Sequence, residues 1–232
     1  MRMLLIARRL LDAALPRSCV LCGVAPLGDA DHGSLCSACE DGLAPWNGAR
    51  CRACGLPLVS EEGICMRCRG VTWAFDEAYP LFSYSGQFRE LLSAYKKGGR
   101  RSLALPLARM AAKEVSRRWP GRIIVPVPPR PGKLRSKGWD QVEEIALCLE
   151  RMGLRVERPL RRASSAEQKR LGREGRAMNA RASYALKPGA SSPEHPLILD
   201  DVITTGATID ACSRALRGGG ARDVAALALA AD

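Results

Sequence analysis

The chain has 232 residues, of which 47% are hydrophobic, and carries a formal net charge of +12. This length allows one large domain, or a domain with a small module beside it. No apolar run in the sequence is long enough to span a membrane, so we expect no membrane span. Arg8, Arg9 and Asp12 interrupt the apolar start of the chain, so we expect an amphipathic helix over residues 1–16 rather than a signal peptide. We therefore expect a cytoplasmic protein.

The positive charge is concentrated in one part of the chain. Between Arg117 and Arg181 there are 17 Lys and Arg residues against 7 Asp and Glu residues. Such an excess favours polyanionic partners, either a substrate that carries pyrophosphate or nucleic acid. A solvated basic surface has the same composition, so charge alone leaves the partner open.

Four Cys-x-x-Cys motifs dominate residues 17–72. Two thiolates at this spacing reach one tetrahedral Zn²⁺ from a tight turn, and two motifs complete a closed structural site. An internal repeat suggests the pairing, because residues 19–27 parallel residues 51–58, and each is followed by a second motif after an aliphatic residue. We expect one zinc ion on Cys19, Cys22, Cys36 and Cys39, and a second on Cys51, Cys54, Cys65 and Cys68; a cross-braced pairing is the alternative. The other two cysteines, Cys148 and Cys212, fall at apolar positions of expected helices.

Residues 73–232 alternate between strand and helix patterns. Strands are expected at 78–84, 122–127, 197–200 and 223–230, and helices at 86–95, 103–119, 139–152 and 208–216. Strands that alternate with helices predict an α/β fold, with a parallel sheet that has helices on both faces. The expected organisation is therefore a helix over 1–16, a cysteine-rich double zinc ribbon over 17–72 and an α/β domain over 73–232.

The segment after the third strand is the most informative of the chain. Its apolar run, Leu197–Leu199, ends in Asp200 and Asp201, and a loop rich in hydroxyl groups leads into the next helix. Open α/β sheets bind ligands at the carboxyl ends of their strands, and the N-terminus of a helix binds phosphate. The acidic pair can accept hydrogen bonds from ribose hydroxyl groups, while the loop presents backbone N–H groups and hydroxyls to a phosphate. The loop consists of Thr204, Thr205, Gly206, Ala207 and Thr208. Alternatively, the two aspartates only cap the next helix, and the residues after them form an ordinary loop without a ligand.

Two basic segments are candidates for contacts with pyrophosphate. One follows the second strand after a proline-rich turn and contains Arg130, Arg135 and Lys137. The other runs from Arg161 to Arg181, is poor in core-forming residues and has the composition of a mobile loop over an active site. A basic surface loop has the same composition.

Together these segments resemble the ComF family, in which a double zinc ribbon precedes a phosphoribosyltransferase-like domain of type I. The residues that carry the resemblance are the four cysteine motifs, Tyr95–Gly98, Pro126–Pro128, Lys137–Gln141, Gln168, Leu171, Arg173, Arg176, Asn179 and Asp200–Thr208. The family pattern has Asn where this chain has Asp140, which places a carboxylate near the expected phosphate site.

The resemblance implies a site for phosphoribosyl pyrophosphate with Mg²⁺. Asp200 and Asp201 would hold the ribose and Thr204–Thr208 the 5-phosphate. The pyrophosphate would be held by Lys96, Arg130, Arg135 and Lys137, with Arg173 and Arg176 closing over it.

Two functional hypotheses follow from the resemblance. The first is an accessory role in natural transformation, in which the protein binds phosphoribosyl pyrophosphate and handles single-stranded DNA together with DNA-uptake proteins. Trp119 and Trp139 are candidates for stacking on bases in this role, although such tryptophans are more often part of a core. The second is transfer of phosphoribose to a nitrogen acceptor in nucleotide metabolism. Whether the protein is an enzyme is left open, because a fold does not establish its chemistry.

Overall fold

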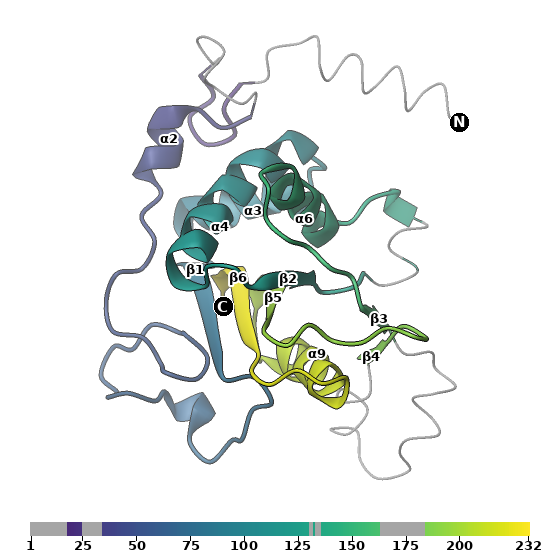
Figure 1. The fold of residues 1–232 in the computed structure, drawn as a ribbon. Coiled ribbons are helices and arrows are strands. Elements are labelled where there is room, and N and C mark those ends of the chain that lie inside the picture. Colours follow the sequence, from purple (N-terminus) through teal and green to yellow (C-terminus); the bar gives the residue numbers. More distant parts are fainter. Residues whose placement is uncertain (1–17, 25–33, 130–131, 133–135, 163–183) are drawn as a thin grey trace.

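A four-stranded parallel sheet forms the centre of the molecule (Figure 1). The computed structural model describes residues 18–24, 34–129, 132, 136–162 and 184–232, and the helix expected over 1–16 lies outside them. The strands are β1 (Glu77–Ser83), β2 (Ile123–Pro126), β5 (Pro196–Ile203) and β6 (Ala225–Ala231), and they lie side by side in the order β1-β6-β5-β2. All three pairings are parallel, as the alternation of strands and helices predicts.

Helices cover both faces of this sheet. On one face lie α3 (Gly86–Lys96), α4 (Ala104–Arg118) and α6 (Gln141–Arg151), and on the other lies α9 (Ala207–Gly218), as Figure 1 shows. Each helix buries one apolar side, and β5 and β6 are buried along nearly their whole length. The predicted fold class, a parallel sheet between helices preceded by a cysteine-rich region, is confirmed.

Shorter elements complete the described chain. They are α2 (Ser37–Gly42), the 3₁₀ turns η1 (Met66–Cys68) and η2 (Arg101–Leu103), and the antiparallel pair β3 (Leu160–Arg162) and β4 (Tyr184–Leu186). The sequence did not predict β3 and β4, since three residues are too few to show a period of two. The mobile segment predicted from Arg161 to Arg181 is wrong at its start, because Arg161 and Arg162 pair with β4 as part of β3. Its other residues, 163–181, lie outside the described part of the chain.

The third expected strand is longer in the structure than its apolar run. β5 continues to Ile203, so Asp200 and Asp201 are part of the strand, although the strand was expected to end at residue 200. Asp200 lies opposite Ala228 of β6, and the ladder continues to the pair Ile203 and Ala231. The hydrogen bonds of the sheet hold the backbone of the two aspartates in place. In the part of the chain that the structure describes, no helix has the length and hydropathy needed to cross a bilayer.

Candidate phosphate and ribose site

The acidic pair lies buried at the carboxyl end of β5. Asp200 and Asp201 are 9% and 8% exposed, and the backbone N–H of Asp201 donates to Oδ1 of Asp200 over 2.8 Å. Consecutive side chains of a strand point to opposite faces of the sheet. The two carboxylates accordingly have different neighbours.

Asp201 is held by residues of two helices. The Lys96 ammonium group, at the end of α3, lies 3.0 Å from Oδ2 of Asp201. The side-chain amide of Gln141, at the start of α6, donates to the same oxygen over 2.5 Å. The Tyr95 hydroxyl donates to the backbone carbonyl of Gln141 over 2.7 Å, which ties α3 to α6 directly beneath the site. One cation and one amide therefore orient Asp201.

Asp200 lies beside Arg162 of β3 and Tyr184 of β4, which line the same cavity. Burial and the charge of Asp201 raise the pKa of Asp200 to about 7, against the lowering effect of the Asp201 N–H and of Lys96. Arg162 donates to the Tyr184 hydroxyl over 2.7 Å, while its buried Nε has no hydrogen-bond partner among the residues that the structure describes. Burial also raises the pKa of Tyr184 to about 12, so the phenol stays protonated near neutral pH. Asp200 is thus a carboxyl group whose charge changes near neutral pH.

The loop between β5 and α9 has the geometry of an anion-binding turn. Gly206 precedes the first residue of α9 with φ +78°, a left-handed conformation that glycine adopts without steric cost. The Thr205 hydroxyl accepts a hydrogen bond from the N–H of Ala207 over 3.4 Å. The first N–H groups of a helix have no partner within the helix, and the helix dipole places positive potential there. Thr204, Thr205 and Ala207 are exposed, so the loop is accessible to a ligand.

A cavity of about 340 Å³ lies beside the two carboxylates, and we call it the β5 cavity. Thr208 lines it, whereas the predicted loop residues Thr204, Thr205, Gly206 and Ala207 do not. Its lining residues are Lys96, Val127–Pro129, Asp140–Val142, Arg162, Tyr184, Asp200–Val202 and Thr208. Of the predicted site residues, the structure brings together Lys96, Asp200, Asp201 and Thr208 around this cavity.

The predicted cations are only partly described. The Lys137 ammonium donates to the backbone carbonyl of Lys96 over 3.1 Å, so it lies next to the cavity without lining it. Arg130, Arg135, Arg173 and Arg176 lie outside the described residues.

The structure gives Asp140 a structural role. Its carboxylate accepts hydrogen bonds from the N–H groups of Val142 and Glu143, over 2.9 and 3.1 Å, and so caps the first turn of α6. Asn serves equally well as an N-cap, which explains why Asp at this position is compatible with the family pattern. The carboxylate still lines the β5 cavity.

The two tryptophans considered for base stacking pack against the core. Trp119 is 5% exposed and donates its indole N–H to Glu77 over 2.5 Å. The ring of Trp139 is partly buried, 5.3 Å from the ring of Tyr95 and within 5.8 Å of the Arg101 guanidinium. Trp119 is thus too buried to stack on a base, and the core interpretation holds for both residues.

Sequence reasoning missed three polar residues of the cavity. Gln141 was quoted only for its place in the family pattern, and Arg162 and Tyr184 were not singled out at all. Arg162 and Tyr184 border the segment 163–183 on its two sides, and only the pairing of β3 with β4 brings them together. No periodicity in the sequence signals that pairing.

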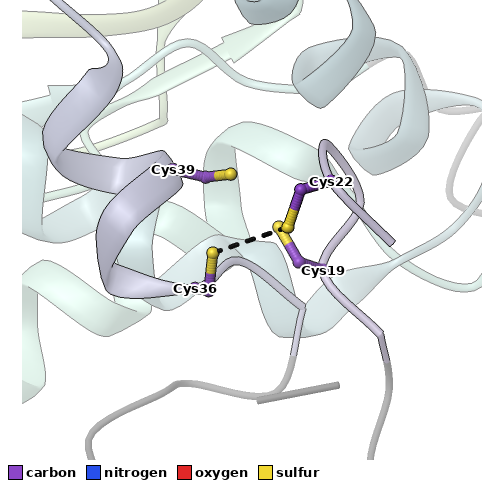
Figure 2. Close-up of side chains that lie close together, drawn as sticks. All are labelled: Cys19, Cys22, Cys36 and Cys39. Atoms are coloured by element: carbon purple, nitrogen blue, oxygen red, sulfur yellow. Dashed lines mark hydrogen bonds between the residues drawn. The ribbon is translucent and has the colours of Figure 1, made fainter. Parts of the chain in front are cut away.

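The cysteines form the two tetrads expected from the repeat. Within each tetrad, Cys19, Cys22, Cys36 and Cys39 or Cys51, Cys54, Cys65 and Cys68, the sulfur atoms all lie within 4.8 Å of one another. Figure 2 shows the first tetrad, in which Cys19 and Cys22 of one turn face Cys36 and Cys39 at the start of α2. The cross-braced alternative is not observed.

The spacing of the sulfur atoms fits zinc. A tetrahedral ion with Zn–S bonds of about 2.3 Å separates its ligands by about 3.8 Å. The Sγ atoms of Cys22 and Cys36 are 3.8 Å apart, and those of Cys54 and Cys65 are 3.6 Å apart. Four thiolates leave no open position for water, so both sites are structural.

Comparisons with known proteins agree with this architecture. Residues 10–69 match the model of the double zinc ribbon domain family. The chain is 28% identical over 207 residues to Competence protein ComFC of Streptococcus pneumoniae, a match that covers 86% of this chain and 88% of that protein. It is 27% identical over 219 residues to DNA utilization protein YhgH of Escherichia coli (strain K12), which covers 90% of this chain and 95% of that protein.

Among solved structures, the chain matches a hypoxanthine phosphoribosyltransferase of Staphylococcus aureus with a TM-score of 0.33 and 11% sequence identity. That match covers 54% of this chain and 61% of the other. The sequence matches extend over both the cysteine-rich region and the α/β domain. They confirm the resemblance to the ComF family, and the match to the family model confirms the double zinc ribbon.

Proposed function

We propose that the β5 cavity binds phosphoribosyl pyrophosphate together with Mg²⁺, and that the protein acts in the uptake or use of DNA. One observation carries the first half of this proposal. The buried pair Asp200 and Asp201 and Thr208, which follows the glycine-capped loop in the first turn of α9, border one cavity, and Lys96 lies beside Asp201.

Each part of the ligand has matching groups in this arrangement. The carboxylates accept hydrogen bonds from the ribose hydroxyls, and the loop Thr204–Thr208 binds the 5-phosphate through N–H and hydroxyl groups. Lys96 contacts the pyrophosphate as a point charge. Lys137, Arg130, Arg135, Arg173 and Arg176 are the further cations that we assign to the pyrophosphate.

The charge of the cavity favours a complex with a divalent cation. Three carboxylates line it, those of Asp140, Asp200 and Asp201, against the cations Lys96 and Arg162. These carboxylates, when ionised, repel a free pyrophosphate group. Mg²⁺ prefers oxygen ligands and is commonly held by substrate phosphates and water, and it neutralises the ligand as it enters.

The proposed role in DNA uptake rests on the relatives and on charge. A competence protein and a DNA utilization protein are similar to this chain over most of its length. The net charge of +12 suits a partner with a phosphate backbone. We assign single-stranded DNA and proteins of the uptake machinery as partners.

Calorimetric titration tests the ligand. Phosphoribosyl pyrophosphate with Mg²⁺ is titrated into the wild type, into Asp200→Asn/Asp201→Asn, and into Asp41→Asn, which removes an exposed carboxylate of α2 outside the β5 cavity. We expect binding by the wild type and by Asp41→Asn and none by the double variant. Equal binding by all three proteins, or by none, contradicts the proposed site.

Fluorescence anisotropy with a labelled single-stranded oligonucleotide tests the proposed binding of DNA. Binding must weaken linearly on a log–log plot as salt rises, because the protein displaces counterions from the phosphates. A duplex of the same sequence is the control. Absence of binding at low salt contradicts direct contact with DNA.

A second candidate function is the transfer reaction itself. The β5 cavity is also lined by Pro128, Pro129 and Tyr184, which are the described residues that an acceptor beside the carboxylates would contact. In this reaction a nitrogen of the acceptor attacks the anomeric carbon, and the bond to pyrophosphate breaks. Pyrophosphate leaves with the electron pair, while the nitrogen loses a proton to solvent. Release of pyrophosphate in a screen of nucleobases and amines supports this function, and binding without release contradicts it.

A further inference from the structure

The second cysteine tetrad lies against the loop that precedes α9. Arg67, which stands between Cys65 and Cys68, donates from Nη1 to the backbone carbonyl of Thr204 over 2.8 Å. The same nitrogen donates to the carbonyl of Asp232 over 3.2 Å. One side chain of the second tetrad's turn, that of Arg67, thus joins the first residue of the loop to the last residue of the chain.

Trp73 makes a second connection. Its indole N–H donates to the Sγ of Cys68 over 3.3 Å. Its ring lies 3.4 Å from the position that a Cβ on Gly206 would take. The indole therefore contacts a zinc-site sulfur on one side and the left-handed residue of the loop on the other.

The chain just after the tetrad also fixes the first turn of α9. The N–H of Ala74 donates to Oδ1 of Asp210 over 2.8 Å, and Asp210 is 5% exposed. Arg214 donates to Oδ2 of the same side chain over 2.9 Å. The ring of Phe75 stacks on that of Trp73 at 5.3 Å and packs into the core beneath α9.

These contacts matter because a phosphate site needs its N–H groups held in one arrangement before the ligand arrives. The loop is exposed at Thr204 and Thr205, and its local hydrogen bonds run from the N–H of Ala207 to the Thr205 hydroxyl and from the N–H of Asp210 to the carbonyl of Gly206. The remaining support comes from the segment 67–74. This segment begins in the tight turn between Cys65 and Cys68. The conformation of that turn depends on the metal ion that holds the two thiolates.

We infer that the second zinc site positions the anion-binding loop Thr204–Thr208, with Arg67 and Trp73 as the positioning residues. This inference deepens the proposed function and rests on it for the identity of the ligand. The first tetrad contacts the chain elsewhere: the Arg100 guanidinium donates to the carbonyl of Ser18 beside it over 3.1 Å. The two zinc sites therefore have different effects on the loop.

The test uses the full chain with both zinc ions. Arg67→Ala removes the bonds to Thr204 and Asp232, Trp73→Leu removes the ring, and Trp73→Phe keeps a ring but loses the bond to Cys68. Arg52→Ala is the matched control, because Arg52 lies in the other motif of the same tetrad and its guanidinium lies against Gly63, not against the loop.

Three quantities are measured for each protein: zinc content, amide hydrogen exchange of residues 200–210, and the dissociation constant for phosphoribosyl pyrophosphate with Mg²⁺. We expect Arg67→Ala and Trp73→Leu to keep two zinc ions while exchange at 204–207 rises and binding weakens by about tenfold. Trp73→Phe should fall between them and the wild type, and Arg52→Ala should match the wild type.

Unchanged exchange and affinity in Arg67→Ala and Trp73→Leu overturn the inference. If Trp73→Leu loses zinc, Arg67→Ala decides, because it removes only contacts on the loop side. If the wild type does not bind phosphoribosyl pyrophosphate, the proposed ligand fails, and hydrogen exchange alone decides whether the zinc site positions the loop.

Discussion

The ammonium group of Lys96 lies 3.0 Å from the carboxylate of Asp201 and ties the last residue of α3 to β5. The side chains of the pair are 28% and 12% exposed, so solvent screens it only in part. In the proposed complex Lys96 contacts the pyrophosphate while Asp201 contacts the ribose. The ion pair therefore places the two binding groups next to each other before any ligand is bound.

Replacing Lys96 should weaken the binding of phosphoribosyl pyrophosphate more than replacing a neighbouring lysine does. We expect Lys96→Met to raise the dissociation constant for phosphoribosyl pyrophosphate by at least about tenfold, because a hydrogen bond to a charged group contributes about 1.5–3 kcal/mol. Lys97→Met removes the neighbouring exposed lysine, which does not line the β5 cavity. It should change the dissociation constant by less than about twofold. Calorimetry at fixed ionic strength measures both. Equal losses of affinity in the two variants would mean that binding depends on the total positive charge and not on the position of Lys96.

The titration of Asp200 predicts how stability depends on pH. Its pKa is raised from 3.8 to about 7 in the folded protein. The native state then holds a proton that the unfolded state releases, so this group's contribution is fully present below about pH 4 and is lost as the pH rises through about 7. Asp200→Asn should therefore be more stable than the wild type at pH 8, by an amount of the order of 2 kcal/mol. Urea unfolding between pH 5 and 8 measures this, with Asp41→Asn as the control, and parallel curves for wild type and Asp200→Asn would refute the assignment.

Gly206 should be required for binding because of its conformation. It has φ +78°, and a Cβ there would lie 3.4 Å from the ring of Trp73. Gly121 has φ +79° in the turn before β2, with nothing within 4 Å of the equivalent position. Both Gly206→Ala and Gly121→Ala should cost about 1–2 kcal/mol of stability. Only Gly206→Ala should weaken the binding of phosphoribosyl pyrophosphate, by about tenfold or more. Similar affinities of the two variants would place the phosphate elsewhere.

Metal analysis tests the two tetrads separately. We expect two zinc ions per chain in the wild type and one in Cys39→Ser or Cys68→Ser, since each removes a ligand from a different site. Cys148→Ser should keep both ions, because Cys148 belongs to neither tetrad. Loss of both ions from either single variant would show that the sites fold as one unit.

Asp140 provides a test that separates capping from charge. Asp140→Ala removes the acceptor for the N–H groups of Val142 and Glu143 and should cost about 1 kcal/mol of stability. Asp140→Asn keeps an acceptor but removes one carboxylate from the cavity, so it should retain stability and bind phosphoribosyl pyrophosphate roughly threefold more tightly. Thermal unfolding and calorimetry measure the two effects, and weaker binding by Asp140→Asn would indicate a direct role of the carboxylate.

Much of the fold could be predicted from the sequence because its signals are local. The apolar runs marked the four strands of the sheet, helical periodicity marked α3, α4, α6 and α9, and the repeat around the cysteine motifs indicated which cysteines share a site. The motif from Leu197 to Thr208 combined a buried strand with the start of a helix, and the structure contains both. Each of these features depends on residues that are close together in the chain.

The tertiary structure alone decided which distant residues meet. Lys96 and Gln141 converge on Asp201 because α3 and α6 pack on the same face of the sheet, and Arg162 meets Tyr184 because β3 pairs with β4. The contact of Trp73 with Gly206 likewise requires the second cysteine tetrad to lie against the start of α9. Composition and periodicity describe a residue's immediate neighbours, whereas these contacts join segments separated by tens of residues, and only the packing of helices on the sheet brings such segments together.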